Sequence, residues 1–350
     1  MEYHKCVLGP LLFIIYINDI YNSSDLGKFI LFADDTNIFV VDKSVQNLYQ
    51  KANTIMNSVY NYMKCNLLHI NIKKCCYIHF TPGKKDVTSS SSSSSNDLIL
   101  TLNNTVIKRV DETKFLGVII DKNLNWKPHT AYLSSKLKCE VGKLCRMRRF
   151  IPKELYNDLY HTLFESHLGY GISVWGGISN NRLEPIFKIQ KKCTRILFGD
   201  QEAYSNKFKT CARTRPIGSQ KLGADFYKRE SSKPLLSRNK ILCVHNLYKY
   251  HCLLEMFKII KLHTPIPMYN LFQKSPRRDN YFITSSATNL FVYKTLSMWN
   301  KFLKPSGNID FSSPIALVKG RIKSMLLNAQ KAGNTDEWSE LNFDGNDMCL

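Results

Sequence analysis

The sequence of 350 residues predicts an α+β fold, with short strands in the first third of the chain and helices after it. Before residue 126, short apolar runs alternate with turn-forming residues, which is typical of strands joined by tight turns. From residue 127 onward, apolar residues recur every three or four positions, which is the period of amphipathic helices. A hydrophobic content of 44% is enough for a packed core.

Two adjacent carboxylates separate two apolar runs near the start of the chain. The runs are Phe29–Phe32 and Ile38–Val41, and Asp34 and Asp35 lie between them. This order predicts a strand, a tight turn that carries both acids, and a returning strand. Carboxylates at a hairpin tip can hold a divalent metal against phosphate, although Asp is also common in turns because it hydrogen-bonds its own backbone.

Two helices are predicted to flank this hairpin. Gly9 and Pro10 precede an apolar run that ends at Ile17, and Pro favours the first turn of a helix. The run is too short to span a membrane and has no small-residue cleavage site, so we expect a buried helix. Residues 44–66 have apolar residues at helical spacing, with Ser44 as the expected N-cap.

Short strands are also predicted between the second helix and residue 126. Their ranges are Tyr77–Phe80, Leu98–Leu102, Val106–Val110 and Lys114–Asp121. Seven consecutive serines, Ser89–Ser95, cannot bury apolar area to offset the entropy of ordering. We therefore expect a flexible Ser-rich loop over residues 86–97.

The rest of the chain is predicted to be mainly helical. The predicted helices are His129–Phe150, Lys153–His167, Arg182–Phe198, Ile241–Leu262, Ala287–Phe302 and Ile315–Ala329. Pro152 separates the first two, because proline breaks a helix interior. Residues 201–240 contain few apolar clusters and predict a linker, and residues 332–350 predict a disordered acidic tail.

The chain is strongly basic, with a formal net charge of +21 and a sequence pI of about 9.4. No Lys or Arg follows Lys331, whereas five acidic residues do, so residues 1–331 alone carry +26. A body this basic is suited to a polyanion, with nucleic acid favoured over a membrane surface.

Two groups of cations could contact nucleic acid. Within the predicted helix 182–198, four cations occupy positions i, i+3, i+4 and i+7, which places them on one face: Lys188, Lys191, Lys192 and Arg195. Arg146 and Arg149 lie where the preceding helix pair joins. A solvated charged face is the alternative for both groups.

The 11 cysteines form no CxxC pair, which argues against a zinc ribbon and favours a reducing compartment. A Cys/His cluster occurs within a predicted helix, at Cys243, His245, His251 and Cys252. Its spacing fits no standard zinc finger, so the alternatives are an unusual metal site and a partly buried helix face.

Four motifs occur in a fixed order over residues 3–126. They are Leu8–Phe13 with Tyr16–Asp19, then Phe32–Asp35, Asn71–Lys74 and Phe115–Val118. In this order they resemble the reverse transcriptase, or RNA-directed DNA polymerase, of non-LTR retrotransposons of the LINE class, jockey-like branch. The resemblance implies a partial polymerase palm with primer-grip strands over residues 1–126, which is an antiparallel sheet with packing helices. It also implies a helical thumb or connection over 127–200 and a C-terminal helical region over 241–331.

The resemblance also implies roles for individual residues. Asp34 and Asp35 would be catalytic and would bind Mg²⁺ or Mn²⁺, and Lys73 would donate a proton to the leaving group. Leu8, Gly9 and Pro10 would belong to the nucleotide and template pocket. Phe115, Leu116 and Gly117 would belong to the primer grip, a hairpin that holds the primer end. The implied partners are an RNA template and a DNA primer, with no membrane, and the family weakly favours the nucleus.

The chain departs from the family pattern at its start. The family supplies another metal-binding Asp from an early palm strand, and a fingers subdomain, and both would precede Met1. His4 and Lys5 also replace the usual Gln-Gly. Because two-metal catalysis needs several carboxylates, we expect no DNA synthesis by this chain alone. The alternatives are a non-enzymatic RNA- or DNA-binding protein with a vestigial catalytic site, and a degenerate product that folds poorly.

Overall fold

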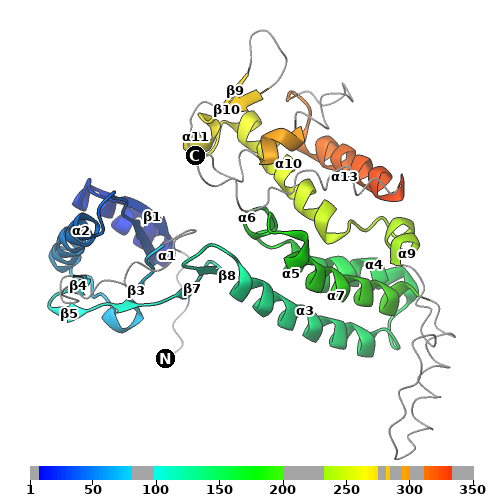
Figure 1. Cartoon of the computed structure of the whole chain (residues 1–350), viewed down its shortest axis with the longest axis horizontal. Coiled ribbons are helices and arrows are strands. Elements are labelled where there is room, and N and C mark those ends of the chain that lie inside the picture. The colour runs from blue at the N-terminus through cyan, green and yellow to red at the C-terminus, as the bar shows by residue number, and fades with distance from the viewer. Residues whose placement is uncertain are drawn as a thin grey trace, which may run out of the picture. The chain divides into compact units, whose positions relative to one another are not determined.

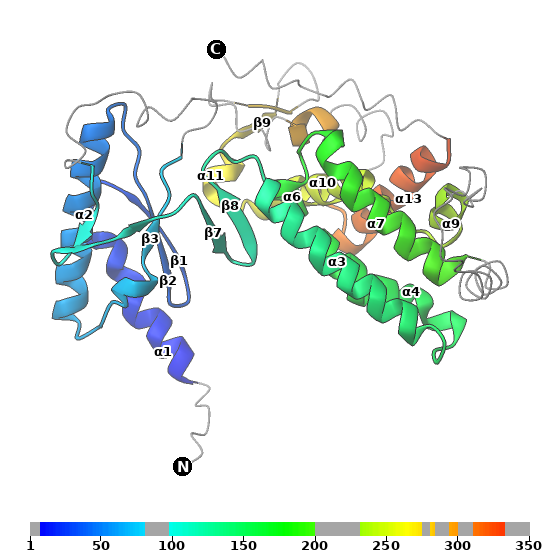
Figure 2. The same cartoon turned by 60° about the horizontal axis from the view of Figure 1, so that its bottom comes forward.

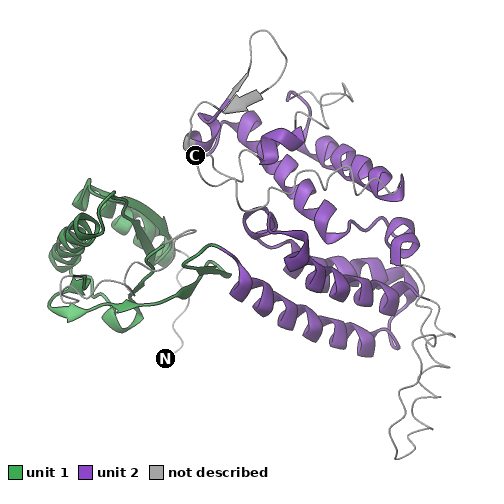
Figure 3. Cartoon of the chain, viewed as in Figure 1, with its two compact units in different colours: residues 1–124 green, residues 125–350 purple. Residues whose placement is uncertain are grey.

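A computed structural model describes residues 8–80, 98–199, 232–274, 281–283, 294–299 and 311–332. These residues form helices and small sheets, which confirms the predicted α+β class (Figure 1). The chain divides into two compact units, unit 1 (residues 1–124) and unit 2 (residues 125–350), shown in Figure 3. His4, Lys5, the Ser-rich loop and nearly all of the acidic tail lie outside the described residues.

Unit 1 begins with a helix, a hairpin and a second helix. The elements are α1 (Leu8–Ile17), the 3₁₀ helix η1 (Asn18–Ser23), β1 (Lys28–Phe32), β2 (Asp35–Phe39) and α2 (Val45–Cys65). β1 and β2 are antiparallel, and Phe32 pairs with Asp35 across the turn. The buried side chains in this part of the unit are Ile17, Ile20, Ile55 and Val59. The predicted hairpin and the predicted helix after Ser44 are therefore both confirmed.

The expectation of a buried first helix is wrong. Only Ile17 of α1 is buried, whereas Leu8, Leu12 and Ile15 are 59%, 61% and 64% exposed. The helix α1 is apolar on all sides, so packing one side of it on the unit leaves the apolar side chains of its other sides in solvent. Only its Phe13 and Ile17 side chains reach the cluster formed with η1 and α2.

Short strands complete unit 1. They follow the 3₁₀ turn η2 (Ile72–Lys74) and are β3 (Cys76–Tyr77), β4 (Thr101–Leu102), β5 (Thr105–Val106), β6 (Lys108–Arg109), β7 (Glu112–Phe115) and β8 (Val118–Asp121). β3 pairs with β6 in parallel, whereas β4 with β5 and β7 with β8 are antiparallel.

All four predicted strands in this region differ from the structure. The strand predicted at Leu98–Leu102 is only Thr101–Leu102, and the one predicted at Val106–Val110 is divided between β5 and β6. The strand predicted at Tyr77–Phe80 is only Cys76–Tyr77. The single strand predicted at Lys114–Asp121 is a hairpin, because Leu116 and Gly117 have φ angles of 44° and 84° and reverse the chain. Positive φ at both central residues is the requirement of the tight turns that join antiparallel strands.

Unit 2 opens with the predicted helix pair and the predicted basic helix. These are α3 (Lys127–Met147), then η4 (Lys153–Leu155), α4 (Tyr156–Leu159), the π-helical turn η5 (Tyr160–Glu165) and α5 (Ser166–Gly169), followed by α6 (Ile172–Trp175) and α7 (Asn180–Phe198). Arg182 Nη1 donates a hydrogen bond to the Asn125 carbonyl at 2.8 Å, which joins the starts of α3 and α7. The two helices run in the same direction (Figure 2).

The later elements complete unit 2. They are α9 (Ser232–Arg238), α10 (Val244–Leu262), α11 (Ile266–Tyr269), the paired strands β9 (Phe272–Lys274) and β10 (Tyr281–Ile283), the helical residues 294–299, and α13 (Ile315–Ala332). The α9 helix occupies part of the predicted linker. Large side chains such as Tyr160, Phe164, Trp175 and Phe257 are fully buried in unit 2. No described helix is long and apolar enough to cross a membrane.

Candidate catalytic corner and nucleic-acid interface

The acidic hairpin presents its two carboxylates at an exposed tip. Ala33 has a φ of 51°, a left-handed conformation that turns the chain between β1 and β2. Asp34 occupies the turn and Asp35 is the first residue of β2, and both are exposed. Asp34 and Asp35 are therefore placed together at the tip, as predicted, where a ligand can reach them.

One face of the hairpin holds it against α2. Phe29, Leu31 and Ile38 pack onto the cluster that contains Ile55. A Cβ at Gly27 would lie 2.9 Å from Ile55 Cδ1, so glycine permits the close approach of the chain before β1. The carboxylates are thus fixed to the core through the apolar side chains of the same two strands.

The donor set at the tip fits the chemistry of the metal that the family implies. Carboxylate oxygens are the ligands that Mg²⁺ and Mn²⁺ prefer, and Asp34 and Asp35 supply them without burial. Among the residues that the structure describes, no three His, Cys, Asp or Glu side chains group closely enough to hold a metal. A bound divalent cation would supply charge stabilisation at phosphate oxygens.

The other predicted site residues of unit 1 lie on different supports. Lys73 is exposed on η2, whose Ile72 packs on a second cluster made by Leu100, Leu102 and Ile107. Leu8, Gly9 and Pro10 are exposed at the start of α1. Phe115, Leu116 and Gly117 are half-buried at the tip of the β7–β8 hairpin.

A tyrosine–aspartate contact near the first helix has no counterpart in the sequence reasoning. The Tyr62 hydroxyl donates a hydrogen bond to Asp19 Oδ1, and Tyr16 Oη donates to the Asn66 carbonyl at 2.6 Å. Burial, followed by the hydrogen bond to Asp19, raises the pKa of Tyr62 to about 12. These bonds tie η1 and the end of α1 to α2, so Asp19 has a structural contact.

The four predicted cations of α7 divide into different environments. Lys188 and Lys192 are exposed, and among the described residues neither has an acidic partner. Lys191 instead lies 3.4 Å from Glu184 Oε1, and its Nζ is 3.8 Å from the centroid of the Phe187 ring. Arg195 is half-buried. The predicted stripe therefore offers Lys188 and Lys192 as its solvent-facing charges.

The opposite face of α7 is apolar, as its spacing predicts. Leu183, Ile186, Ile189, Cys193 and Ile196 are buried. The charged face is therefore held outward by the packing of the same helix.

Two more predicted cations lie near the end of α3. Arg146 and Arg149 are exposed. Because α3 and α7 start together and run in the same direction, their last turns lie at the same end of unit 2 (Figure 2). Arg146 and Arg149 are therefore at the end of the unit toward which Lys192 also lies.

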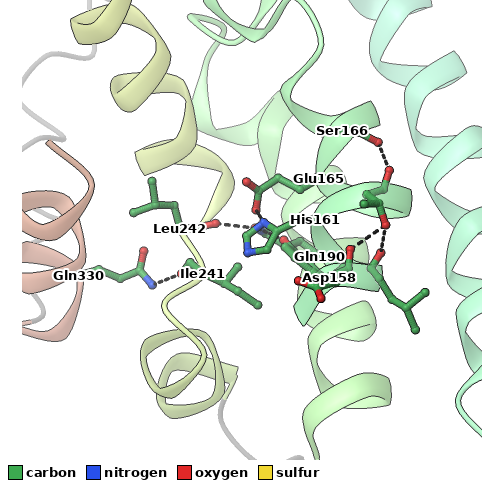
Figure 4. Close-up of polar contacts among 11 residues, drawn as sticks. Asp158, His161, Glu165, Ser166, Gln190, Ile241, Leu242 and Gln330 are labelled. Carbon is green, nitrogen blue, oxygen red and sulfur yellow. Dashed lines mark hydrogen bonds and ion pairs between the residues drawn. The ribbon is translucent and has the colours of Figure 1, made fainter. Parts of the chain in front are cut away.

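Sequence reasoning missed a buried glutamine on α7. Gln190 Nε2 donates hydrogen bonds to Tyr160 Oη at 2.8 Å and to the Leu242 carbonyl at 2.9 Å (Figure 4). Its Oε1 accepts the Val244 N–H at 2.9 Å. Gln190 is fully buried, so these bonds satisfy groups that water does not reach.

A second glutamine, Gln330 of α13, hydrogen-bonds the same stretch of chain, residues 241–244. Gln330 Nε2 donates to the Ile241 carbonyl at 3.1 Å, and its Oε1 accepts the Cys243 N–H at 3.0 Å. Residues 241–244, which lead into α10, are thus held between α7 and α13 (Figure 4). The one sequence signal was a polar residue at a core position of an otherwise apolar face, Gln190 between Ile189 and Cys193.

The Cys/His cluster of α10 has the character of a buried helix face. Burial raises the pKa of the Cys252 thiol to about 12 and also raises that of Cys243. Burial lowers the pKa of His245 and of His251. His245 makes an edge contact with the Phe187 ring at a centroid distance of 5.3 Å. Cys243 and Cys252 are both buried free thiols on this helix face.

Comparisons with known proteins agree with the motifs of unit 1. Residues 6–120 match the family model described as "Reverse transcriptase (RNA-dependent DNA polymerase)". The RNA-directed DNA polymerase from mobile element jockey of Drosophila funebris is 23% identical over 203 residues, which cover 55% of this chain and 21% of that protein. A probable RNA-directed DNA polymerase from transposon X-element of Drosophila melanogaster is 24% identical over the same coverage.

A third relative matches a shorter stretch more closely. The retrovirus-related Pol polyprotein from type-1 retrotransposable element R1 of Bradysia coprophila is 35% identical over 79 residues, 22% of this chain and 8% of that protein. No solved structure matches the chain. The chain spans about a fifth of the length of the jockey and X-element relatives. The predicted resemblance is confirmed: residues 6–120 match the reverse transcriptase model, and the chain is similar to RNA-directed DNA polymerases of the jockey and X-element mobile elements.

Proposed function

We propose that this chain binds nucleic acid through the basic side of unit 2, and that the acidic hairpin does not support DNA synthesis in this chain alone. In this proposal unit 1 corresponds to part of a polymerase palm, and α3 to α7 correspond to a thumb. The observation that carries the binding proposal is the pair of exposed cations Lys188 and Lys192 on one face of α7, neither of which has an acidic partner within the described part of the chain. They belong to a body whose net charge is +26 over residues 1–331.

Electrostatics favour a polyanion at this face. Lys188 and Lys192 are four residues apart on a helix, and such like-charged pairs repel by about 0.2–0.5 kcal/mol. A phosphate backbone relieves the repulsion, and binding is driven further by release of the counterions that the backbone holds. The apolar face of α7 is packed into unit 2, so the lysines are presented by a rigid helix.

The salt dependence of binding tests this proposal. Each phosphate contact on a single strand contributes about 0.7 to the slope of log affinity against log salt. We expect the double substitution Lys188→Ala and Lys192→Ala to reduce the slope for a single-stranded oligonucleotide by about 1.4, if each lysine contacts one phosphate.

The matched control is Lys191→Ala on the same helix. Lys191 already lies against Glu184 and Phe187, so its removal should change the slope much less. An unchanged slope in the double variant, or an equal change in the control, contradicts the assignment of this face.

The second candidate function is the family reaction, RNA-templated DNA synthesis. It is favoured by one observation, the two exposed carboxylates at the β1–β2 tip. In that case Asp34 and Asp35 hold the metal, and Lys73 donates a proton to the leaving group. Two-metal nucleotidyl transfer needs more than two carboxylates to hold its cations, so this candidate requires a further acidic group near the tip.

A further inference from the structure

The most acidic part of the chain follows the last helix of its most basic unit. Residues 332–350, the acidic segment, carry five carboxylates and no Lys or Arg. The carboxylates belong to Asp336, Glu337, Glu340, Asp344 and Asp347. Apolar side chains are interleaved with them, including Trp338, Leu341 and Phe343. A peptide with this composition can pair with a basic helical face and also cover apolar surface beside it.

We propose that the acidic segment docks in cis on the exposed face of α7 around Lys188 and Lys192, and competes there with nucleic acid. The competition rests on the proposed function, because it assigns the same face to nucleic acid. The contact itself does not, because it follows from the charges and from where the segment is attached.

The hydrogen bonds of Gln190 and Gln330 show where the acidic segment is attached relative to α7. Gln330 lies two residues before the acidic segment and bonds to Ile241 and Cys243. Gln190 of α7 bonds to Leu242 and Val244 of the same four-residue stretch. The segment therefore starts one short stretch of chain away from the middle of α7. Lys188 and Lys192 are each two residues from the buried Gln190 and so lie on the opposite face of the helix, which the segment must pass around α7 to reach.

The segment is long enough to reach the whole face. An extended chain spans about 3.3–3.6 Å per residue, so the segment can reach roughly 60 Å from the end of α13. The 19 residues of α7 make a helix about 28 Å long. Attachment beside α7 gives the carboxylates an effective concentration in the millimolar range at this face.

The charges of the two partners are complementary. Lys188 and Lys192 have no acidic partner among the described residues, whereas neighbouring Lys191 is already paired with Glu184. The segment therefore supplies the charge that the exposed lysines lack. Since exposed ion pairs are screened by salt, the contact should weaken as ionic strength rises.

Carbodiimide cross-linking of the full chain tests the contact without nucleic acid. This reagent joins a carboxylate to an amine only where the two touch. We expect peptides that link the acidic segment to Lys188 or Lys192, with a yield that does not depend on protein concentration. Links from the segment only to other lysines overturn the proposal, and a yield that rises with concentration does so too, because it places the segment on a second copy.

Binding of a single-stranded oligonucleotide tests the competition. The variant replaces all five carboxylates by amides, as Asp336→Asn, Glu337→Gln, Glu340→Gln, Asp344→Asn and Asp347→Asn. With a millimolar effective concentration and a weak segment–helix contact, we expect affinity to rise about two- to tenfold at low salt.

A double-mutant cycle separates this contact from net charge. In the background Lys188→Ala with Lys192→Ala, the gain from the five amides should disappear, because the docking face is already removed. An equal gain in both backgrounds means a general charge effect and overturns the proposal, as does no gain in the native background. If the lysine variant leaves the salt slope unchanged while the cross-links persist, the proposed function fails and the docking contact stands.

Discussion

Unit 1 holds its helices and hairpins together with two small apolar clusters, whereas unit 2 combines a larger apolar core with buried polar contacts. The clusters of unit 1 contain four and three buried residues, and its first helix leaves Leu8, Leu12 and Ile15 largely in solvent. Unit 2 buries Tyr160, Phe164, Trp175 and Phe257 completely.

The family motifs are concentrated in unit 1, the unit with the smaller apolar clusters. The reverse transcriptase model matches residues 6–120, which all lie in unit 1. The exposed cations of α7 are in unit 2, beyond that match. The comparison shows that the part of a chain that resembles a known family need not be the part with the larger apolar core.

The largest expected effect is a loss of stability when buried polar contacts of unit 2 are removed. Replacing Gln190 by Ala leaves Tyr160 Oη, the Leu242 carbonyl and the Val244 N–H buried without this partner. We expect a loss of about 3–5 kcal/mol in the free energy of unfolding, since each unsatisfied buried group costs about 1–3 kcal/mol. Denaturant unfolding measures it, with Asn181→Ala at an exposed position of α7 as the control. A loss below about 1 kcal/mol would show that the glutamine is not a principal support of unit 2.

The next largest effect is a loss of stability at acidic pH. Burial lowers the pKa of His129, His245 and His251, all in unit 2. These histidines bind protons less readily in the folded chain than in the unfolded chain. Their contribution to the free energy of unfolding is therefore complete above the unfolded pKa of about 6.5 and is lost as the pH falls below it. Unit 2 should therefore be less stable at pH 5 than at pH 7.

The variant His245→Phe sharpens this test. It keeps an aromatic ring against Phe187 and removes one titrating group. We expect a smaller loss of stability between pH 7 and pH 5 than in the native chain, measured by denaturant unfolding. Asp42 does not interfere in this window, because its hydrogen bond from Lys51 lowers a pKa that is already below 4. An unchanged difference between the two pH values contradicts the assignment to His245.

The smallest effect concerns the acidic turn of unit 1. Ala33 is exposed and has a φ of 51°, which costs an L-residue about 1–2 kcal/mol. Ala33→Gly relieves this cost but gives the unfolded chain more freedom, so we expect a net gain of about 0.5–1 kcal/mol. Slower hydrogen exchange of the β1–β2 amides would confirm it. Ala33→Val should have the opposite sign, and the same sign in both variants would contradict the strained turn.

Local patterns predicted much of unit 1 and most of the unit 2 helices. Alternating runs around Asp34 and Asp35 predicted the hairpin, and helical spacing predicted α2, α3 and α7. Both depend on the period of neighbouring residues, which the sequence contains directly.

Tertiary partners decided what the patterns could not. The exposure of α1 depends on which elements reach it. The bonds from Gln190 and Gln330 to residues 241–244 join positions more than 50 residues apart in sequence. The spacing did not predict the turn at Leu116, because leucine seldom adopts positive φ, whereas the family resemblance did imply a hairpin there.

The most direct test of the central claim follows binding and synthesis in one assay, on a poly(rA)/oligo(dT) template-primer with Mg²⁺ or Mn²⁺. We would compare the native chain with Asp34→Ala plus Asp35→Ala, and with Lys188→Ala plus Lys192→Ala. The proposal predicts no primer extension by any of the three, equal binding by the native chain and the aspartate variant, and weaker binding by the lysine variant. Extension by the native chain that is lost in the aspartate variant would contradict it and establish the hairpin as a working polymerase site.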